Sequence, residues 1–167
     1  MVLKNSIKVA LAGNPNSGKT TLFNLLTGLN QKTGNFPGVT IEKKSGFIKL
    51  KAQGQDNYTA IEFIDLPGIY SLYPRSIDEQ ITHRVLTDVT DPDHQDVILA
   101  VVDSANLKRS LFFVVQLINL KLPLVLVLND TEKKATSDLA VSRLSEKLGV
   151  KVIRANALTG KGAADIK

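Results

Sequence analysis

An eight-residue stretch near the N-terminus combines two glycines, a lysine and a threonine at a spacing that suits phosphate binding. It fits the pattern G-x-x-x-x-G-K-[ST], with the members Gly13, Asn14, Pro15, Asn16, Ser17, Gly18, Lys19 and Thr20. The glycines let the backbone curl so that N–H groups point at phosphate oxygens, and a following helix adds the positive end of its dipole. The Lys19 ammonium can reach the β- and γ-phosphates, and the Thr20 hydroxyl can ligate Mg²⁺. The stretch therefore predicts a P-loop that binds a nucleoside triphosphate.

The flanks of this stretch decide between a P-loop and an ordinary glycine-rich turn. An apolar run at 7–12 predicts a strand before it, and Leu22, Phe23, Leu25 and Leu26 predict a helix after it, over 18–27. A strand, a loop and a helix in this order are the context that the phosphate-binding motif requires. The flanks favour the P-loop.

A second segment with suitable chemistry is Asp65-Leu66-Pro67-Gly68, at the end of a predicted strand. The Asp65 carboxylate can hold the hydration shell of Mg²⁺, because this ion keeps much of its water. Gly68 can offer its N–H to a γ-phosphate, since it has no Cβ in the way. The same residues are also common in simple turns. Their place downstream of a P-loop favours the nucleotide-binding interpretation.

The loop predicted over Gly28 to Thr40 has no apolar periodicity, and loops of this length in compact domains are usually functional. Thr40 could ligate Mg²⁺ through its hydroxyl, as in switch loops that a triphosphate orders. Alternatively, Thr40 is only a β-branched residue that enters the next strand. Its spacing alone leaves both interpretations open.

Residues that could recognise the base follow two predicted strands near the C-terminus. They are Asn129, Asp130, Thr131 and Glu132 after one strand, and Asn156, Ala157 and Leu158 after the other. Guanine offers two adjacent donors, N1–H and N2–H₂, which one carboxylate can accept together. Because adenine lacks this pair of donors, a buried carboxylate would discriminate between the two bases.

The elements that must position these residues alternate between strand and helix patterns, which predicts an α/β fold with a mostly parallel sheet. The expected strands are 7–12, 41–51, 58–64, 97–102, 124–128 and 151–155, and the expected helices are 18–27, one from Ser76, 106–120 and 137–148. The strands 41–51 and 58–64 read as an antiparallel hairpin joined through 53–57.

Caps and apolar stripes predict how three of the helices begin, end and pack. Ser76 and Glu79 form a capping box, while Ser137 and Gly149 bound the helix 137–148. The inward faces expected from spacing are Ile77, Ile81, Val85 and Val89 in the helix from Ser76, Leu107, Leu111, Val114, Val115 and Ile118 in the helix 106–120, and Leu144 and Leu148 in the helix 137–148.

Composition restricts the class of protein. A chain of 167 residues suits one domain, with 43% hydrophobic and 22% charged residues. No apolar run approaches the length of a membrane span, and without cysteine there is no disulfide framework or thiolate metal site. The net charge of +5 is compatible with a nucleic acid, an acidic membrane surface or the phosphates of a nucleotide, but no block of like charges favours the nucleic acid.

Taken together, the segments Gly13–Thr20, Thr40, Asp65–Gly68, Asn129–Glu132 and Asn156–Leu158 resemble the ordered motifs of Ras-like GTPases. More specifically, two segments are similar to the N-terminal G domain of the ferrous iron transport protein B family, FeoB. They are Gly34–Thr40 (the first switch, with N-F-P-G-V-T) and residues 65–79 (the second switch, with D-L-P-G-I-Y-S-L and S-I-D-E). The resemblance covers essentially the whole chain. It implies a Ras-like P-loop GTPase fold, with one antiparallel hairpin and helices on both faces.

The resemblance also implies the ligands and the residues that hold them. GTP or GDP would be bound by Gly13–Thr20, Thr21, Gly38, Val39, Thr40, Asp65–Gly68, Asn129–Glu132 and Asn156–Leu158, with Thr20, Thr40 and Asp65 on Mg²⁺. The catalytic positions would be Asn16, Lys19, Thr40 and Gly68.

Two positions bear on the rate of hydrolysis that the resemblance implies. Asn16 matches the asparagine that coordinates K⁺ in potassium-activated GTPases, where the cation supplies the charge of an arginine finger. Ile69 stands where Ras-like enzymes carry a glutamine that orients water, and an isoleucine cannot do this by hydrogen bonding. We therefore expect slow hydrolysis that K⁺ stimulates more than Na⁺.

The base-reading motif departs from the family pattern N-x-x-D, because its fourth residue is Glu132. The longer side chain could still accept the guanine donors if the loop shifts by about one methylene, or it could relax specificity. Asp130 is a substitute acceptor that the register disfavours.

The resemblance places the chain in a longer membrane protein. Only residues 163–167 remain to begin the helix that should cover the last strand, so we expect the G domain of residues 1–167 to be a fragment. Its partner would be the membrane-embedded transporter domain of the same protein, at the cytoplasmic face of the bacterial inner membrane, and the full-length protein could form homo-oligomers. No nucleic-acid partner is expected. The alternative is an RNA- or ribosome-associated assembly GTPase, which shares the G-x-P-N-x-G-K form.

Overall fold

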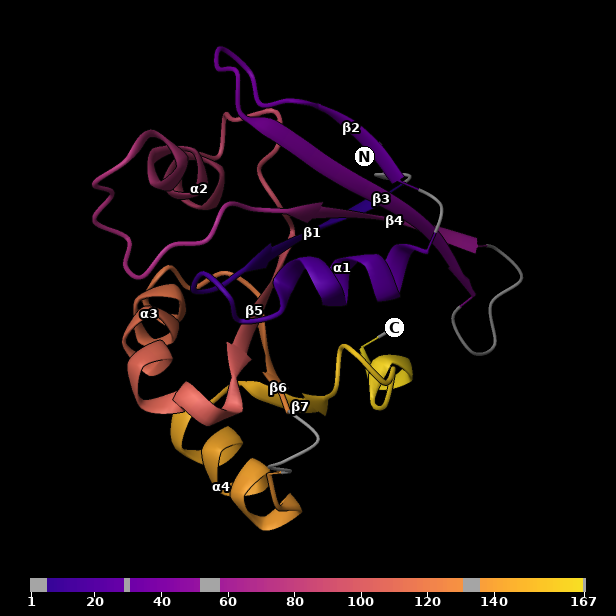
Figure 1. The fold of residues 1–167 in the computed structure, drawn as a ribbon, viewed down its shortest axis with the longest axis vertical. Coiled ribbons are helices and arrows are strands. Elements are labelled where there is room, and N and C mark those ends of the chain that lie inside the picture. Colours follow the sequence, from indigo (N-terminus) through magenta and orange to yellow (C-terminus); the bar gives the residue numbers. More distant parts are fainter. Residues whose placement is uncertain (1–5, 29–30, 52–57, 131–135, 167) are drawn as a thin grey trace.

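The computed structural model describes residues 6–28, 31–51, 58–130 and 136–166. Seven strands of this part form one sheet in the order β2-β3-β4-β1-β5-β6-β7 (Figure 1). Their bounds are β1 Ser6–Ala12, β2 Gln31–Asn35, β3 Glu42–Lys51, β4 Tyr58–Asp65, β5 Val97–Asp103, β6 Leu124–Asn129 and β7 Lys151–Ala155. Strands β4, β1, β5, β6 and β7 are parallel, whereas β3 runs antiparallel to both β2 and β4.

Helices cover both faces of the sheet, as expected. They are α1 Lys19–Thr27, α2 Ile77–Thr87, α3 Leu107–Asn119 and α4 Asp138–Leu148. In β1, Val9 and Leu11 pack with α1, whereas Ala10 and Ala12 lie in the core shared with α2, α3 and α4. None of the described helices is long and apolar enough to cross a lipid bilayer.

The carboxyl ends of the parallel strands bring distant segments together at one edge of the sheet. Leu11 pairs with Asp65, and Asn129 pairs with both Asp103 and Ala155. Strand register therefore places the carboxyl ends of β4, β1, β5, β6 and β7 in this order along one edge of the sheet, as binding sites in parallel sheets require.

The expected sheet is confirmed, with one correction. The segment Gly28–Thr40, predicted as a loop, contains β2, which pairs with β3 from Gln31–Gly46 to Asn35–Glu42. All five residues of β2 are exposed, because the strand lies at the edge of the sheet and neither face is covered. The hairpin turn predicted over 53–57 lies outside the described residues.

The predicted helix caps are confirmed. Ser76 accepts a hydrogen bond from the N–H of Glu79 at 3.3 Å, and the Glu79 carboxylate accepts one from the N–H of Arg75 at 2.6 Å. Ser137 accepts from Ala140, and Gly149 ends α4 in the left-handed conformation with φ 67°.

The predicted inward faces are only partly right. Ile81 and Val85 are buried, but Ile77 is 62% exposed and Val89 lies beyond the end of α2 with 76% exposed. In α3, Val115 is 46% exposed, and the buried positions are Ser110, Phe113, Val114 and Leu117. Both the predicted and the observed sets have the three- and four-residue spacing of one helix face, so spacing alone does not distinguish them, and Leu107 and Ile118 of the predicted set are partly buried against the same core.

Candidate functional site

The predicted P-loop joins β1 to α1 at the edge where the parallel strands end. Ser17 donates its N–H to the carbonyl of Asn14 at 3.2 Å, which closes a turn. Gly18 has φ 89°, and α1 begins at the next residue. A Cβ on Gly18 would come within 2.1 Å of the Asn129 amide nitrogen, so the sequence must carry glycine here. The loop thus leads directly into a helix N-terminus, the geometry that binds anions.

Lys19 is a buried cation within this loop. Its side chain is 7% exposed, and Nζ donates to the Asn14 carbonyl at 3.3 Å. Burial lowers the pKa of Lys19, and the attraction of Asp65 opposes this effect only in part. A buried ammonium whose positive charge the protein compensates only in part favours the binding of an anion such as a phosphate.

Thr20 and Asp65 meet at the start of α1. The Thr20 hydroxyl donates to Oδ2 of Asp65 at 2.7 Å, and Oδ1 of Asp65 is buried without a hydrogen-bond partner in the described part of the chain. Burial raises the pKa of Asp65, while the Thr20 hydrogen bond and then Lys19 oppose the rise. A hydroxyl beside an unsatisfied carboxylate oxygen is the kind of donor set that Mg²⁺ prefers.

The second switch touches the P-loop through its backbone. A Cβ on Gly68 would lie 2.8 Å from the nitrogen of Pro15, so only glycine fits this approach. The N–H of Ile69 donates to the Gly13 carbonyl at 3.2 Å. The Ile69 side chain is 0% exposed and packs in the core with α2, so it also has no access to a phosphate-bound water.

Asn129 connects the P-loop to the last loop of the site. Its amide nitrogen donates to the carbonyl of Ser17 at 3.0 Å, and its amide oxygen accepts from the N–H of Ala157 at 3.0 Å. Both predicted base-reading segments are therefore fixed to the P-loop by one side chain, 112 residues away from Ser17 in the chain.

Asp130 does not fit the role of a substitute base acceptor. It is 7% exposed, and its two oxygens accept hydrogen bonds from the N–H and the hydroxyl of Thr136 at 2.9 and 2.8 Å. The guanidinium of Arg154 lies 4.0 Å away. These partners hold the carboxylate in the loop itself. Thr131 and Glu132 lie outside the described residues.

The third loop of the site is shaped by Asn156. Its amide oxygen accepts from the N–H groups of Leu158 and Thr159 at 3.0 and 2.9 Å. Ala157 is buried and Leu158 is 81% exposed. Side-chain oxygens of asparagine commonly stabilise turns in this way.

Thr40 is a predicted site residue that the structure does not bring to the P-loop, and Gly38 and Val39 lie in the same loop. It is exposed, and within the described part of the chain no hydrogen bond joins it to Thr20 or Asp65. The loop that carries Gly38, Val39 and Thr40 lies beside α2, away from the start of α1 (Figure 1).

Residues from α3 contribute to the site, and sequence reasoning missed them. A cavity of 190 Å³ beside the P-loop is lined by Asn14, Pro15, Asn16, Ser17, Tyr70, Asp103, Asn106, Arg109 and Ser110. Asn14 donates to the Ser110 hydroxyl at 3.2 Å, and the Arg109 guanidinium lies 4.4 Å from the ring centre of Tyr70. The apolar pattern of α3 carries no signal for these polar contacts.

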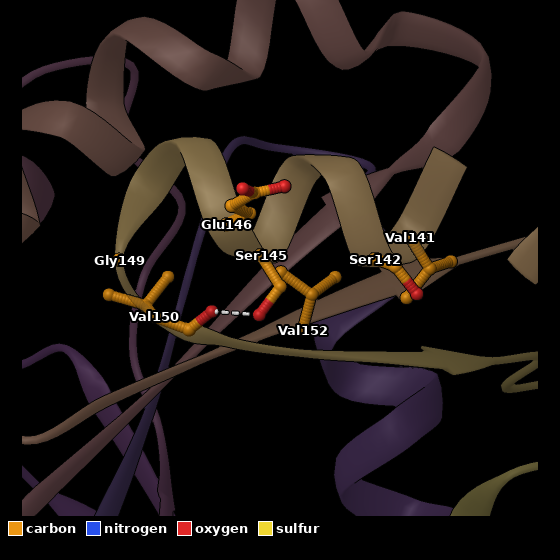
Figure 2. A pocket seen from close by; sticks show the side chains of 7 residues that line it. All are labelled: Val141, Ser142, Ser145, Glu146, Gly149, Val150 and Val152. Carbon is orange, nitrogen blue, oxygen red and sulfur yellow. Dashed lines mark hydrogen bonds between the residues drawn. The ribbon is translucent and has the colours of Figure 1, made fainter. Parts of the chain in front are cut away.

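A larger hollow of 560 Å³ lies between α4 and β7 (Figure 2). Its walls include Val141, Val150 and Val152, and the Ser145 hydroxyl donates to the Val150 carbonyl at 2.7 Å. None of the predicted phosphate- or metal-binding residues lines it. Size therefore does not identify the binding site in this fold.

Comparisons with known proteins identify the family of the chain. The family described as ferrous iron transport protein B matches residues 7–167. The Fe(2+) transporter FeoB of Leptospira biflexa is 40% identical over 161 residues, which cover 95% of this chain and 22% of that protein. The FeoB of Escherichia coli K12 is 39% identical over 168 residues, covering 96% of this chain and 20% of that protein. The chain thus spans about a fifth of the length of these curated relatives.

Solved structures give the same result. The G domain of the T. maritima FeoB iron transporter has a TM-score of 0.79 and 36% identity, with 96% of this chain and 94% of that chain covered. A mutant of S. thermophilus NFeoB bound to GDP has a TM-score of 0.79 and 40% identity, covering 96% and 59%. The GMPPNP form of the T. maritima cytosolic domain has a TM-score of 0.77 and 34% identity, covering 96% and 60%. The chain therefore belongs to the ferrous iron transport protein B family.

Proposed function

We propose that the chain binds GTP and GDP and hydrolyses GTP slowly, as the G domain of a ferrous iron transporter. The observation that carries the proposal is the convergence of the P-loop, Asp65 and Asn129 at the carboxyl ends of parallel strands of one sheet. Relatives of this chain have been solved with GDP and in a GMPPNP form. A nucleotide seated on the P-loop would meet a cation, a metal-binding pair and a base-reading loop in that order.

The proposal gives each residue of the phosphate end a role. Lys19 would neutralise phosphate oxygens, and backbone N–H groups of residues 13–21, other than Pro15, which has none, would cradle them. Thr20 and Asp65 would hold Mg²⁺, which would supply positive charge against the phosphates. Gly68 would offer its N–H to the γ-phosphate, and Thr40 would supply a further ligand for the metal if the first switch moves toward the P-loop.

Guanine specificity is the first test of this function. In direct binding titrations we expect GTP and GDP to bind at least about a hundredfold more tightly than ATP, because adenine lacks the pair of donors that a base-reading carboxylate accepts. XTP should bind more weakly than GTP, since xanthine has a carbonyl where guanine has its N2–H₂ donor. The variant Glu132→Asp is the matched comparison, because it restores the N-x-x-D pattern. A preference of the wild-type chain for ATP would refute the guanine assignment.

Potassium stimulation is the second test, and it depends on Asn16. This residue is exposed at the edge of the P-loop, with its backbone in the left-handed region at φ 62°. An amide oxygen there can hold a monovalent cation against the phosphates. We expect hydrolysis to be several-fold faster in K⁺ than in Na⁺, and Asn16→Ala to lose this difference. Equal rates in the two salts, or a variant that keeps its stimulation, would contradict the role.

We also propose that the domain works within a longer protein at the cytoplasmic face of the bacterial inner membrane. The support is the family of the chain and its coverage of about a fifth of the curated relatives, which are Fe(2+) transporters. The partner would then be a membrane-embedded transporter domain of the same protein, in a homo-oligomer or alone. Measuring Fe²⁺ uptake by the full-length protein, with and without an intact Lys19, tests this role.

A further inference from the structure

The first switch is held against α2 by apolar packing. Phe36 is 1% exposed and lies in the same core cluster as Ile69, Ile81 and Val85, with Val39 partly buried against it. The predicted Mg²⁺ ligand of the same loop, Thr40, is exposed. The loop therefore has a defined seat on the second switch and its helix, away from the P-loop (Figure 1).

The backbone of the loop is closed on itself in this seat. Phe36 donates its N–H to the Ile41 carbonyl at 3.0 Å, and Val39 donates to the Phe36 carbonyl at 3.2 Å. Gly38, between them, has φ 79°. These two N–H groups report on the closed form of the loop, because they lose their partners when the loop opens.

Two contacts of charged side chains hold the loop in place, one at Pro37 and one at Lys43, which follows the loop in β3. Arg84 of α2 donates from Nη2 to the Pro37 carbonyl at 3.3 Å, and its Nε lies 2.7 Å from Oδ2 of Asp91. At the other end, Lys43 forms an ion pair with Asp93. Asp91 connects the two fastenings, because its Oδ1 accepts a hydrogen bond from the N–H of Asp93 at 2.8 Å.

The burial of the carboxylates makes these contacts specific. The side chains of Asp91 and Asp93 are 3% and 7% exposed, whereas Arg84 and Lys43 are 36% and 20% exposed. A carboxylate buried to this degree needs its cation, and Asp91 fixes the orientation of the guanidinium plane. The fork of Arg84 can then contact Asp91 and the first switch together, which a single ammonium cannot do.

We infer that Arg84, Asp91 and Asp93 are positioning residues that hold the first switch, and with it Thr40, away from the nucleotide. This inference rests on the proposed function. Because Arg84 lies on α2, which follows the second switch, the same side chain couples the two switches. A triphosphate must break the contacts of Pro37 and Lys43 to bring Thr40 to the metal, so these contacts oppose GTP more than GDP.

The sharpest variant is Arg84→Lys, since lysine keeps the charge beside Asp91 but loses the second donor to Pro37. Asp93→Asn removes the other fastening and leaves Lys43 free to reach solvent. Arg143→Lys, at an exposed position of α4, is the matched control. Hydrogen exchange of the segment 36–41, measured on the 167-residue chain without nucleotide, tests the seat directly. We expect exchange about tenfold faster in both variants and unchanged in the control.

The second measurement is the ratio of the dissociation constants for GMPPNP and GDP. We expect it to shift toward GMPPNP by about three- to tenfold in Arg84→Lys and Asp93→Asn. Unchanged exchange in both variants would overturn the role of Arg84 and Asp93 in holding the loop, and faster exchange with an unchanged ratio would overturn its effect on nucleotide choice. If the wild-type chain bound neither nucleotide, the proposed function would fail, while the exchange experiment would still decide whether Arg84 and Asp93 hold the first switch.

Discussion

Replacing Lys19 by methionine should weaken GTP binding by about a hundredfold or more and abolish measurable hydrolysis, while the fold remains intact. Lys19 is 7% exposed and donates to one carbonyl, that of Asn14. Its burial lowers its pKa, which shows that the protein alone stabilises the ammonium poorly. Truncating one partner of a buried charge pair costs about 2–5 kcal/mol of binding, which corresponds to this loss of affinity.

Methionine is the informative substitution because it keeps an unbranched side chain of similar length and a good helix propensity at the first residue of α1. The thermal midpoint should be equal to that of the wild type or higher, since a buried cation has been removed. Lys147→Met, at an exposed position of α4, provides the control for the loss of one positive charge. Wild-type GTP affinity in Lys19→Met would show that this ammonium does not face the phosphates.

The parts of the candidate site whose arrangement could be predicted from the sequence are those set by local spacing and strand register. The P-loop lies within eight residues, so the glycine, lysine and threonine positions fix their own geometry. Asp65 follows its strand directly, and the parallel register of β1 and β4 then brings it to Thr20. Such information is contained in short segments of sequence and in the rule that parallel strands end at one edge.

The features that sequence did not predict depend on contacts between distant segments. Strand β2 has no apolar alternation, because it is exposed on both faces and is held by pairing with β3 alone. Phe36 belongs to a recognisable motif, yet nothing in the motif indicates that its ring is buried beside Val85 of α2. Two further contacts likewise join segments that are far apart in the sequence. They are the contact of Arg109 with Tyr70 and that of Arg84 with Pro37.

The position of Thr40 shows why a motif predicts a ligand set better than it predicts a conformation. A switch loop has to adopt two positions, and its sequence must be compatible with both. In this structure the loop packs on α2, with Phe36 in the core and Thr40 exposed. The residues that form this seat, such as Arg84 and Asp91, lie outside every nucleotide-binding motif.

Replacing Asp65 by asparagine should separate stability from function. Folding raises the pKa of Asp65 above its ordinary value of 3.8, chiefly through burial. The folded state therefore binds this proton more tightly than the unfolded chain does. The stability that the proton contributes is fully present below the pKa of the unfolded chain, and it is lost as the pH rises through the higher pKa of the folded state. At neutral pH the ionised carboxylate therefore lowers the free energy of unfolding.

Asparagine removes this effect and keeps an oxygen that can accept the hydrogen bond of Thr20. We expect the thermal midpoint at pH 7 to rise by about 2–4 °C, and the difference from the wild type to shrink as the pH falls toward 4. Thermal unfolding at several pH values in the absence of Mg²⁺ measures both. A midpoint that falls, or a difference independent of pH, would show that the Asp65 carboxylate is well compensated within the protein.

The same substitution should weaken the Mg²⁺-dependent part of GTP binding by about tenfold or more, because a neutral amide is a poorer ligand for Mg²⁺ than a carboxylate. Binding measured with and without Mg²⁺ isolates this part, and the affinity without the metal should change little. Asp138→Asn, a substitution of the 91% exposed carboxylate at the start of α4, is the matched control. A gain in stability together with a loss of metal-dependent binding would show that the buried charge of Asp65 favours binding of the metal and destabilises the fold. Unchanged Mg²⁺ dependence would instead assign the metal to other residues.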